Sequence, residues 1–154
     1  MNNWDDLLLT GGFAPRDRLL RGLTLEQVSA RPHGAAHSIY EELWHAAMCQ
    51  KLTLDQDRAA LARWEQATHF PASAAPESQD AWDELVLMFL NYSERAVRLA
   101  DDETWLESPG ADDPSGTWRN TLEWLAVHSA YHMGKIVLLR ELLGLWPRPA
   151  SEAV

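Results

Sequence analysis

The sequence predicts an all-α protein built as a four-helix bundle. Apolar residues recur at the three- and four-residue spacing of a buried helix face in four stretches, and long connections separate the later ones. No stretch shows the sustained alternation of apolar and polar residues that marks a half-buried strand, and no Asn-Gly turn is present. Helices of this kind bury their apolar faces against one another, so a bundle is the expected architecture.

The N-terminal region predicts a broken helix followed by a short one. The first helix spans about residues 3–21, where two adjacent glycines and Pro15 predict either a kink or a division into two pieces. A short helix is expected over residues 24–30, before an Arg-Pro loop. This region therefore supplies the first side of the bundle in an irregular form.

The second long helix begins at Ser38. This serine and Glu41 form a capping box, in which each side chain accepts a hydrogen bond from the backbone N–H of the other residue. We expect the helix to continue through Cys49 to about Trp64. The Pro-, Ala- and Ser-rich stretch THFPASAAPESQD that follows predicts a loop.

The last two helices flank a second long loop. The third helix is expected over about residues 79–100, and the loop over residues 101–117 is rich in proline and glycine. The fourth helix begins near Thr117 and ends at Gly144, a suitable residue just beyond a helix end. We expect residues 1–147 to form a single domain and residues 148–154 to form a disordered tail.

Composition excludes several classes of protein. The formal net charge is −10 and no Lys/Arg cluster is present, so we expect no nucleic-acid partner. No run of about 18 apolar residues exists, so no membrane span is expected. The N-terminus lacks the basic region of a signal peptide. The single cysteine allows no internal disulfide and fits a reducing compartment, so we expect a cytoplasmic protein.

Two histidines lie on the apolar face of the fourth helix. His128 and His132 are one turn apart, about 40° from each other around the helix axis. A buried imidazole without a hydrogen-bond partner costs about 1–3 kcal/mol. Two such groups that can point at one place form a metal chelate. From the residues alone, a metal site and a pair of core histidines are equally open.

A metal ion would need a third ligand from another helix. His45 is the best candidate because it lies in the middle of the second long helix, whereas the other histidines lie in loops or at the helix start. Three neutral imidazoles would leave a divalent ion its full charge. The ion could then act as a Lewis acid or lower the pKa of a bound water or thiol.

Two polar neighbours of His45 have more than one interpretation. Glu41, one turn before it, could orient a ligand or act as a base, but its capping role already explains it. Cys49, one turn after it, could bind a metal ion as a thiolate. A small buried apolar side chain is the more common role of such a cysteine, so Cys49 is not included among the ligands.

Aromatic residues are concentrated on the two ligand-bearing helices. Trp44, Trp118 and Trp124 either line a pocket for a flat or apolar small molecule or, as is more common, pack between helices. Tyr131 lies about 100° from His132 around the helix and is expected to face a neighbouring helix.

The chain resembles the DinB-like (DinB/YfiT-like) superfamily of metal-dependent proteins over nearly its whole length. The resemblance is carried by GLTLEQVSARP, by HSIYEELWH and by HSAYHMGKIVLLRELLGLWPRP. It implies a down-up-up-down bundle that holds a divalent metal ion on three histidines, which correspond here to His45, His128 and His132. We expect zinc or nickel, since imidazole ligands suit both.

The resemblance also implies a function. Relatives include thiol-dependent S-transferases and isomerases that use low-molecular-weight thiols, so a small-molecule substrate is expected, and a hydrolase could use the same open metal position. Family members commonly pair, which implies a homodimer. The alternative is a non-catalytic bundle, stabilised by its metal ion, that binds a small ligand or serves a stress response.

One residue departs from the family pattern. Lys135 stands in HMGKI, where the family commonly has glutamine. The favoured interpretation is that its aliphatic stem packs and its ammonium reaches water. The alternative is that the ammonium lies at the rim of the pocket and favours an anionic ligand.

Overall fold

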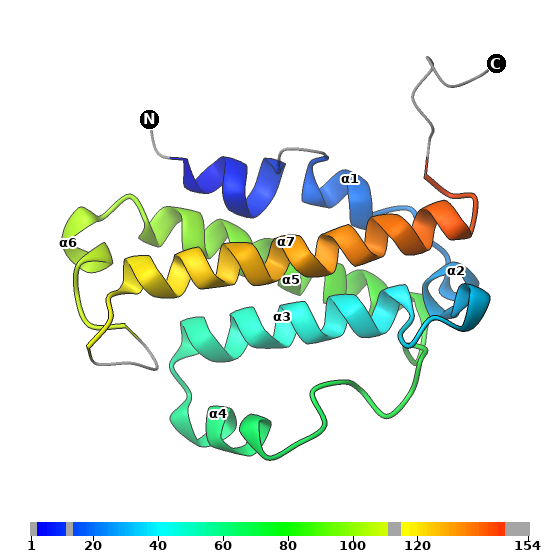
Figure 1. The fold of residues 1–154 in the computed structure, drawn as a ribbon, viewed down its shortest axis with the longest axis horizontal. Helices are drawn as coiled ribbons and strands as arrows, with labels where there is room; N and C mark the ends of the chain where they lie inside the picture. Colours follow the sequence, from blue (N-terminus) through cyan, green and yellow to red (C-terminus); the bar gives the residue numbers. More distant parts are fainter. Residues whose placement is uncertain (1–2, 12–13, 111–114, 147–154) are drawn as a thin grey trace.

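All regular elements of the computed structural model are helices (Figure 1). It describes residues 3–11, 14–110 and 115–146, and within them the only extended pairing is an isolated bridge between Pro109 and Thr117. The all-α prediction is therefore confirmed. The predicted tail, residues 148–154, lies outside the described residues, and the single domain stays a prediction.

The elements in chain order are η1 (Asp6–Thr10), α1 (Arg16–Leu20), α2 (Leu25–Ser29), η2 (Pro32–Gly34), α3 (Ile39–Asp55), α4 (Arg58–Glu65), α5 (Gln79–Leu99), α6 (Glu103–Leu106) and α7 (Trp118–Leu142).

Three long helices form the body of the molecule. Helix α3 packs against both α5 and α7, and the short elements η1 and α1 pack against α5 and α7 as well. In Figure 1, α7 therefore has η1 and α1 along one side and α3 along the other. The first predicted helix is thus two pieces, as expected. The break includes Gly11, whose φ of 61° lies in the region that favours glycine.

The apolar core consists of two clusters along the long helices. One gathers side chains from α1, α3, α5 and α7, with Trp82, Phe89 and Ile136 fully buried. The other lies toward α6 and includes Leu106 and Leu122. Burial of one such side chain contributes about 1.5–3 kcal/mol. The apolar faces predicted from helical spacing are therefore the faces that hold the helices together.

Side-chain caps define where the three long helices begin. The Ser38 hydroxyl accepts from the Glu41 N–H at 3.2 Å, and the Glu41 carboxylate accepts from the Ser38 N–H at 2.7 Å. The predicted capping box is confirmed. A second box at Thr117 begins α7. Gly144, with φ 71°, follows the end of α7 as expected.

The second long helix is shorter than predicted. It ends at Asp55, because Gln56 takes a left-handed conformation (φ 53°, ψ 31°) and turns the chain. A new helix, α4, then begins with Asp57, whose carboxylate accepts from the Ala60 N–H at 2.9 Å. The prediction of one helix to about Trp64 is wrong. The break carries no glycine or proline, so helical spacing alone gave no reason to expect it.

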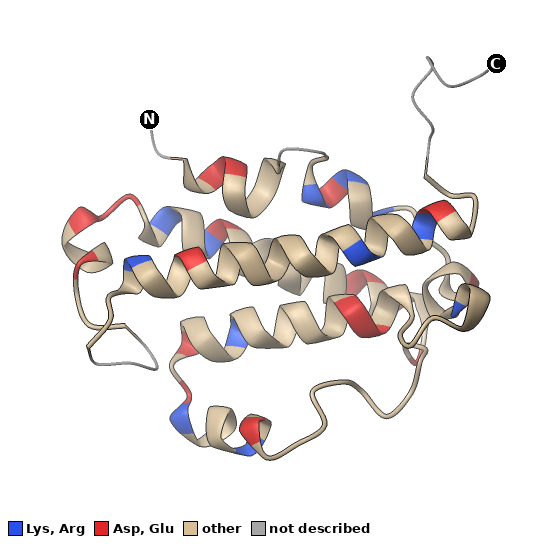
Figure 2. Ribbon diagram, viewed as in Figure 1, with Lys and Arg blue, Asp and Glu red and all other residues tan. Residues whose placement is uncertain are grey.

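Charge and length also bear on possible partners. No helix in the described part of the chain is long and apolar enough to cross a membrane. In Figure 2, Lys and Arg are spread over several helices and are interspersed with Asp and Glu. The expected absence of a nucleic-acid partner stays a prediction, as does the cytoplasmic location.

Candidate metal centre

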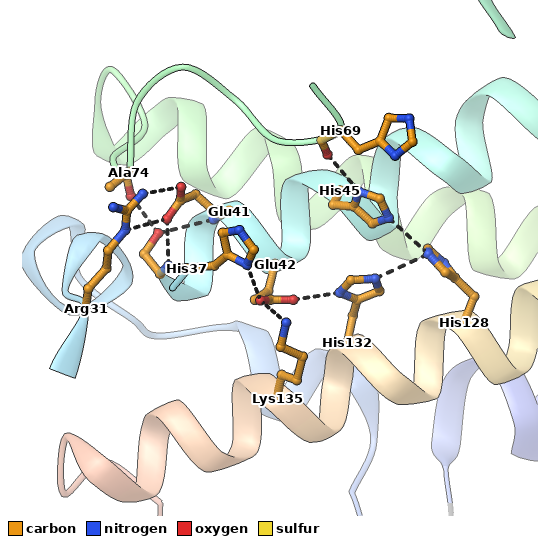
Figure 3. Close-up of polar contacts among 11 residues, drawn as sticks. Arg31, His37, Glu41, Glu42, His45, His69, Ala74, His128, His132 and Lys135 are labelled. Atoms are coloured by element: carbon orange, nitrogen blue, oxygen red, sulfur yellow. Dashed lines mark hydrogen bonds and ion pairs between the residues drawn. The ribbon is translucent and has the colours of Figure 1, made fainter. Parts of the chain in front are cut away.

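Three histidine side chains meet where α3 faces α7 (Figure 3). His45 from α3 and His132 from α7 are buried, and His128 is half-buried. His128 Nε2 lies 3.0 Å from His45 Nε2 and 3.2 Å from His132 Nε2. Two nitrogens bound to one tetrahedral zinc ion lie about 3.3 Å apart, given Zn–N distances of about 2.0–2.1 Å. His128 Nε2 is therefore close to a nitrogen of each of the other two rings, at separations similar to those between metal ligands.

Hydrogen bonds on the far side of two rings determine where their protons lie. His45 Nδ1 is 2.7 Å from the backbone oxygen of His69, and His132 Nδ1 is 2.7 Å from Glu42 Oε2. Both oxygens only accept, so each Nδ1 carries a proton and donates. In the neutral rings, Nε2 then holds a lone pair directed toward His128.

Burial keeps these imidazoles in the neutral form that binds metal ions. Desolvation, followed by the nearby His132 and His45, lowers the pKa of His128 to about 4. Desolvation is also the main cause that lowers the pKa of His45, against the hydrogen bond to the His69 carbonyl. Both rings are therefore neutral at pH 7. A metal ion could bind them without first displacing protons.

Glu42 is the main functional residue that the sequence analysis missed. Its carboxylate is fully buried, and Oε1 accepts from Lys135 Nζ at 2.5 Å and His37 Nδ1 at 3.1 Å, while Oε2 faces His132. Burial by itself would raise the pKa of Glu42, but the hydrogen bonds from His132 and Lys135 outweigh it and lower that pKa. The general need of a metal-ligating histidine for a carboxylate partner could have directed attention to it.

Glu41 and Lys135 have roles that the structure now specifies. Glu41 caps α3, as predicted, and also forms an ion pair with Arg31. Its carboxylate bonds to Arg31 and the Ser38 N–H, whereas that of Glu42 bonds to His132, so Glu42 rather than Glu41 faces the site. The Lys135 ammonium forms an ion pair with Glu42. Neither interpretation of Lys135 from the sequence included this partner.

Cys49 lies close enough to be a candidate ligand. Its sulfur is 3.6 Å from His45 Nε2, and the ligand atoms of His45, Cys49 and His128 all lie within 4.8 Å of one another. Burial raises the pKa of the thiol to about 12, so without a cation it stays protonated at neutral pH. These three residues could bind a metal ion, although the sequence analysis did not include Cys49 among the ligands.

Aromatic rings surround the histidines. Phe70 stacks on His45 with ring centroids 4.9 Å apart, and Trp124 stacks on His128 at 4.8 Å. Tyr131 contacts His132 edge-on, but it is 61% exposed, so the prediction that it faces a neighbouring helix is wrong. Of the three tryptophans named from the sequence, Trp124 is the one that stacks on a ligand candidate.

The other two tryptophans lie elsewhere. Trp118 is buried in the second core cluster and stacks on Trp105, and Trp44 packs against the first cluster. The remaining histidines also take separate roles: His69 provides its backbone carbonyl and His33 lies exposed in η2. Helical spacing could not distinguish these cases, since each depends on which element packs alongside.

Comparison with known proteins places most of the chain in a family. The model of the DinB family matches residues 16–152, a range that includes α3, α7 and all three histidines. No curated protein and no solved structure matches the chain.

Proposed function

Because the chain belongs to the DinB family, we propose that it is a metal-dependent enzyme whose divalent ion is held by His45, His128 and His132. The observation that carries this proposal is the position of His128 Nε2, which lies 3.0 Å from His45 Nε2 and 3.2 Å from His132 Nε2. A single proton can bridge two of these nitrogens, whereas one metal ion accepts a lone pair from all three. Zinc and nickel are the proposed ions, because imidazole suits both.

The proposed scaffold is the down-up-up-down bundle. In Figure 1, η1, α1 and α7 run in one direction and α3 and α5 run in the opposite one. The contact between α3 and α7 brings the histidines of the two helices close together. These observations support the topology that the family resemblance implies.

The proposed chemistry is thiol-dependent group transfer to a small electrophile. A divalent ion on three neutral ligands keeps its charge and, when bound, lowers the pKa of a thiol or water at its open position. The chain's own residues prepare that position. The Glu42 carboxylate accepts from the Nδ1–H of His132 and so orients that ring. The His69 carbonyl orients His45 in the same way. The rings of Phe70 and Trp124, stacked on His45 and His128, limit access by water. A low-molecular-weight thiol is the proposed co-substrate, and hydrolysis of a small ester or amide is the variant that uses water instead.

Metal analysis of matched variants tests the ligand set. Metal per chain, measured by elemental analysis of untagged protein, is expected to fall at least tenfold in His45→Ala, His128→Ala and His132→Ala. His33→Ala is the control, because His33 is exposed in η2 and should leave the metal content unchanged. Full metal content in the three site variants would refute the ligand set.

An activity assay tests the reaction. Conjugation of a model electrophile with several low-molecular-weight thiols is expected to require the metal ion, to stop on addition of a chelator and to return when zinc or nickel is restored. Turnover that is unaffected by complete metal removal would refute a metal-dependent transferase.

The second candidate function is a non-catalytic metal staple, and Cys49 is the observation that favours it. A thiolate and an imidazole on one tetrahedral zinc ion lie about 3.5 Å apart, close to the 3.6 Å between Cys49 Sγ and His45 Nε2. A sulfur ligand would give the ion four protein ligands and leave no open position. X-ray absorption of the metal-loaded protein distinguishes the two, since a sulfur neighbour supports the staple and its absence supports the enzyme.

An exposed patch on α7 supports the expected homodimer. Trp124, Val127 and Tyr131 are 52%, 72% and 61% exposed, and they lie on one face of the helix at three- and four-residue spacing. Large apolar side chains grouped in this way mark interaction surfaces. We propose a dimer through this face. Light scattering should report twice the 17.4 kDa of one chain, and Val127→Glu should shift the mass to one chain.

A further inference from the structure

A hollow lies beside the histidine cluster, between η2 and the C-terminal half of α7. Its volume is about 280 Å³, at the lower end of the range for small-molecule pockets. Pro32 and Ala35 form one wall, and Leu138, Leu139 and Leu142 form the other. The hollow is thus an apolar slot that suits a small, narrow molecule.

The backbone of η2 is held in an unusual conformation at this wall. His33 (φ 52°, ψ 31°) and Gly34 (φ 76°) follow one another in the left-handed region, which residues other than glycine rarely adopt. A hydrogen bond of 3.0 Å from the Ala35 N–H to the Pro32 carbonyl closes the turn. Unfavourable backbone conformations persist at ligand sites where the surroundings enforce them.

The polar end of the hollow has more donors than acceptors. Glu42, Lys135 and His37 lie there, and the Glu42 carboxylate already accepts from both Lys135 and His37 as well as from His132. An ammonium has three N–H groups, and Lys135 gives one of them to Glu42. The Lys135 side chain is 35% exposed, and its Nζ lies 5.3 Å from the centroid of the Tyr131 ring. The remaining N–H groups can therefore serve a ligand that brings its own acceptor.

We propose that this hollow binds a small monocarboxylate with an apolar tail. The tail would lie between Pro32 and the leucines of α7, and the carboxylate would accept from the Lys135 ammonium. An amine would find the Glu42 carboxylate already occupied by three donors, and an alcohol would lack the charge that strengthens the hydrogen bond. A ligand with several negative charges would be disfavoured by Glu42 and by the chain's net charge of −10. This site goes beyond the proposed function and does not depend on a bound metal ion.

Titration calorimetry with simple carboxylates tests the proposal on the intact protein. Butanoate, hexanoate and octanoate should bind with affinity that rises about fourfold for each added methylene until the slot is full. Octanoate should bind at least tenfold more tightly than octanol, and octylamine should not bind measurably. Equal affinity for octanoate and octanol, or no gain with chain length, would overturn the proposal.

The two lysines of the chain provide a matched pair of variants. Lys135→Gln should weaken octanoate binding at least tenfold, whereas Lys51→Gln should leave it within twofold, since Lys51 pairs with Asp55 elsewhere on α3. Leu138→Glu is a second variant at an exposed position of the wall and should abolish binding without disturbing the fold. Unchanged binding in Lys135→Gln or in Leu138→Glu would overturn the proposal.

A metal-site variant separates this proposal from the proposed function. His45→Ala is expected to lose the metal ion and to bind octanoate as the wild type does. Loss of metal with retained carboxylate binding supports both proposals. Loss of carboxylate binding in metal-free His45→Ala would instead mean that the hollow depends on the metal centre, which contradicts the present inference.

Discussion

Replacing Glu42 by glutamine should weaken metal binding with little change in shape. The carboxylate now accepts hydrogen bonds from three donors, on His132, Lys135 and His37. A glutamine amide has one acceptor oxygen and one donor nitrogen, so at least one side must lose its bond. If the amide oxygen of the glutamine faces His132, the His132 ring keeps a hydrogen-bond acceptor, but that acceptor is neutral instead of anionic.

The expected effect is large enough to measure. Removing the partner of a metal-bound histidine typically costs about 10–100-fold in metal affinity, which is about 1.4–2.7 kcal/mol. Zinc affinity, measured by competition with a chelating dye, should therefore fall by that factor in Glu42→Gln. The spectroscopic or elemental signature of bound metal should remain at saturating zinc, because the three histidines are still present.

Glu41→Gln is the matched control. The two glutamates are adjacent and both buried, but the Glu41 carboxylate bonds to Arg31 and the Ser38 N–H rather than to a histidine. Glutamine can keep the capping-box contact, so this variant should lower the melting temperature only through the lost ion pair with Arg31 and leave zinc affinity within twofold. Equal zinc affinity in Glu42→Gln and wild type, or equal loss in both variants, would refute the positioning role of Glu42.

Three further predictions concern the fold. Gln56→Gly should raise the free energy of unfolding, measured in urea, by about 1 kcal/mol, because glycine adopts the left-handed conformation of Gln56 without strain. If the helix instead continued through this position, the same substitution would lower the free energy of unfolding by about 1 kcal/mol. Burial raises the pKa of Asp55, but hydrogen bonds from Lys51, Tyr92 and Arg95 outweigh it and lower that pKa. Asp55 therefore stabilises the fold above its unfolded pKa of about 4 and loses this contribution as pH falls, so the difference in melting temperature between wild type and Asp55→Asn should shrink in acid. Phe89→Ala should cost about 3–5 kcal/mol by urea unfolding, whereas Leu87→Ala, at a 45% exposed position, should cost under about 1 kcal/mol.

Local patterns predicted much of the fold. Helix α5 spans Gln79–Leu99, where apolar spacing placed it, and α7 ends just before Gly144. The capping box at Ser38 was correct as well. These features depend on residues within four positions of one another, so the sequence contains the interactions that determine them.

The break between α3 and α4, by contrast, does not follow from local patterns. Left-handed Gln56 is unfavourable by about 1–2 kcal/mol on its own. Contacts made after the turn compensate for it, among them Trp64 against Trp44 and against His45. Since both partners lie on the other helix, a pattern along one helix could not reveal the turn. The short α6 in the predicted loop was missed too; Asp102 caps it through the Thr104 and Trp105 N–H groups.

The sequence by itself determined that the chain is helical and that His128 and His132 share an apolar helix face, because both follow from spacing along one segment. It also singled out His45, by its place in a helix, as the third residue of interest. Only the tertiary structure decided that His45 and His132 both approach His128, that Glu42 rather than Glu41 faces His132, and that Cys49 lies within reach. Glu42 and His132 are 90 positions apart, and their contact exists because α3 packs against α7. Contacts of that kind depend on how whole helices dock, which the spacing within either helix does not specify.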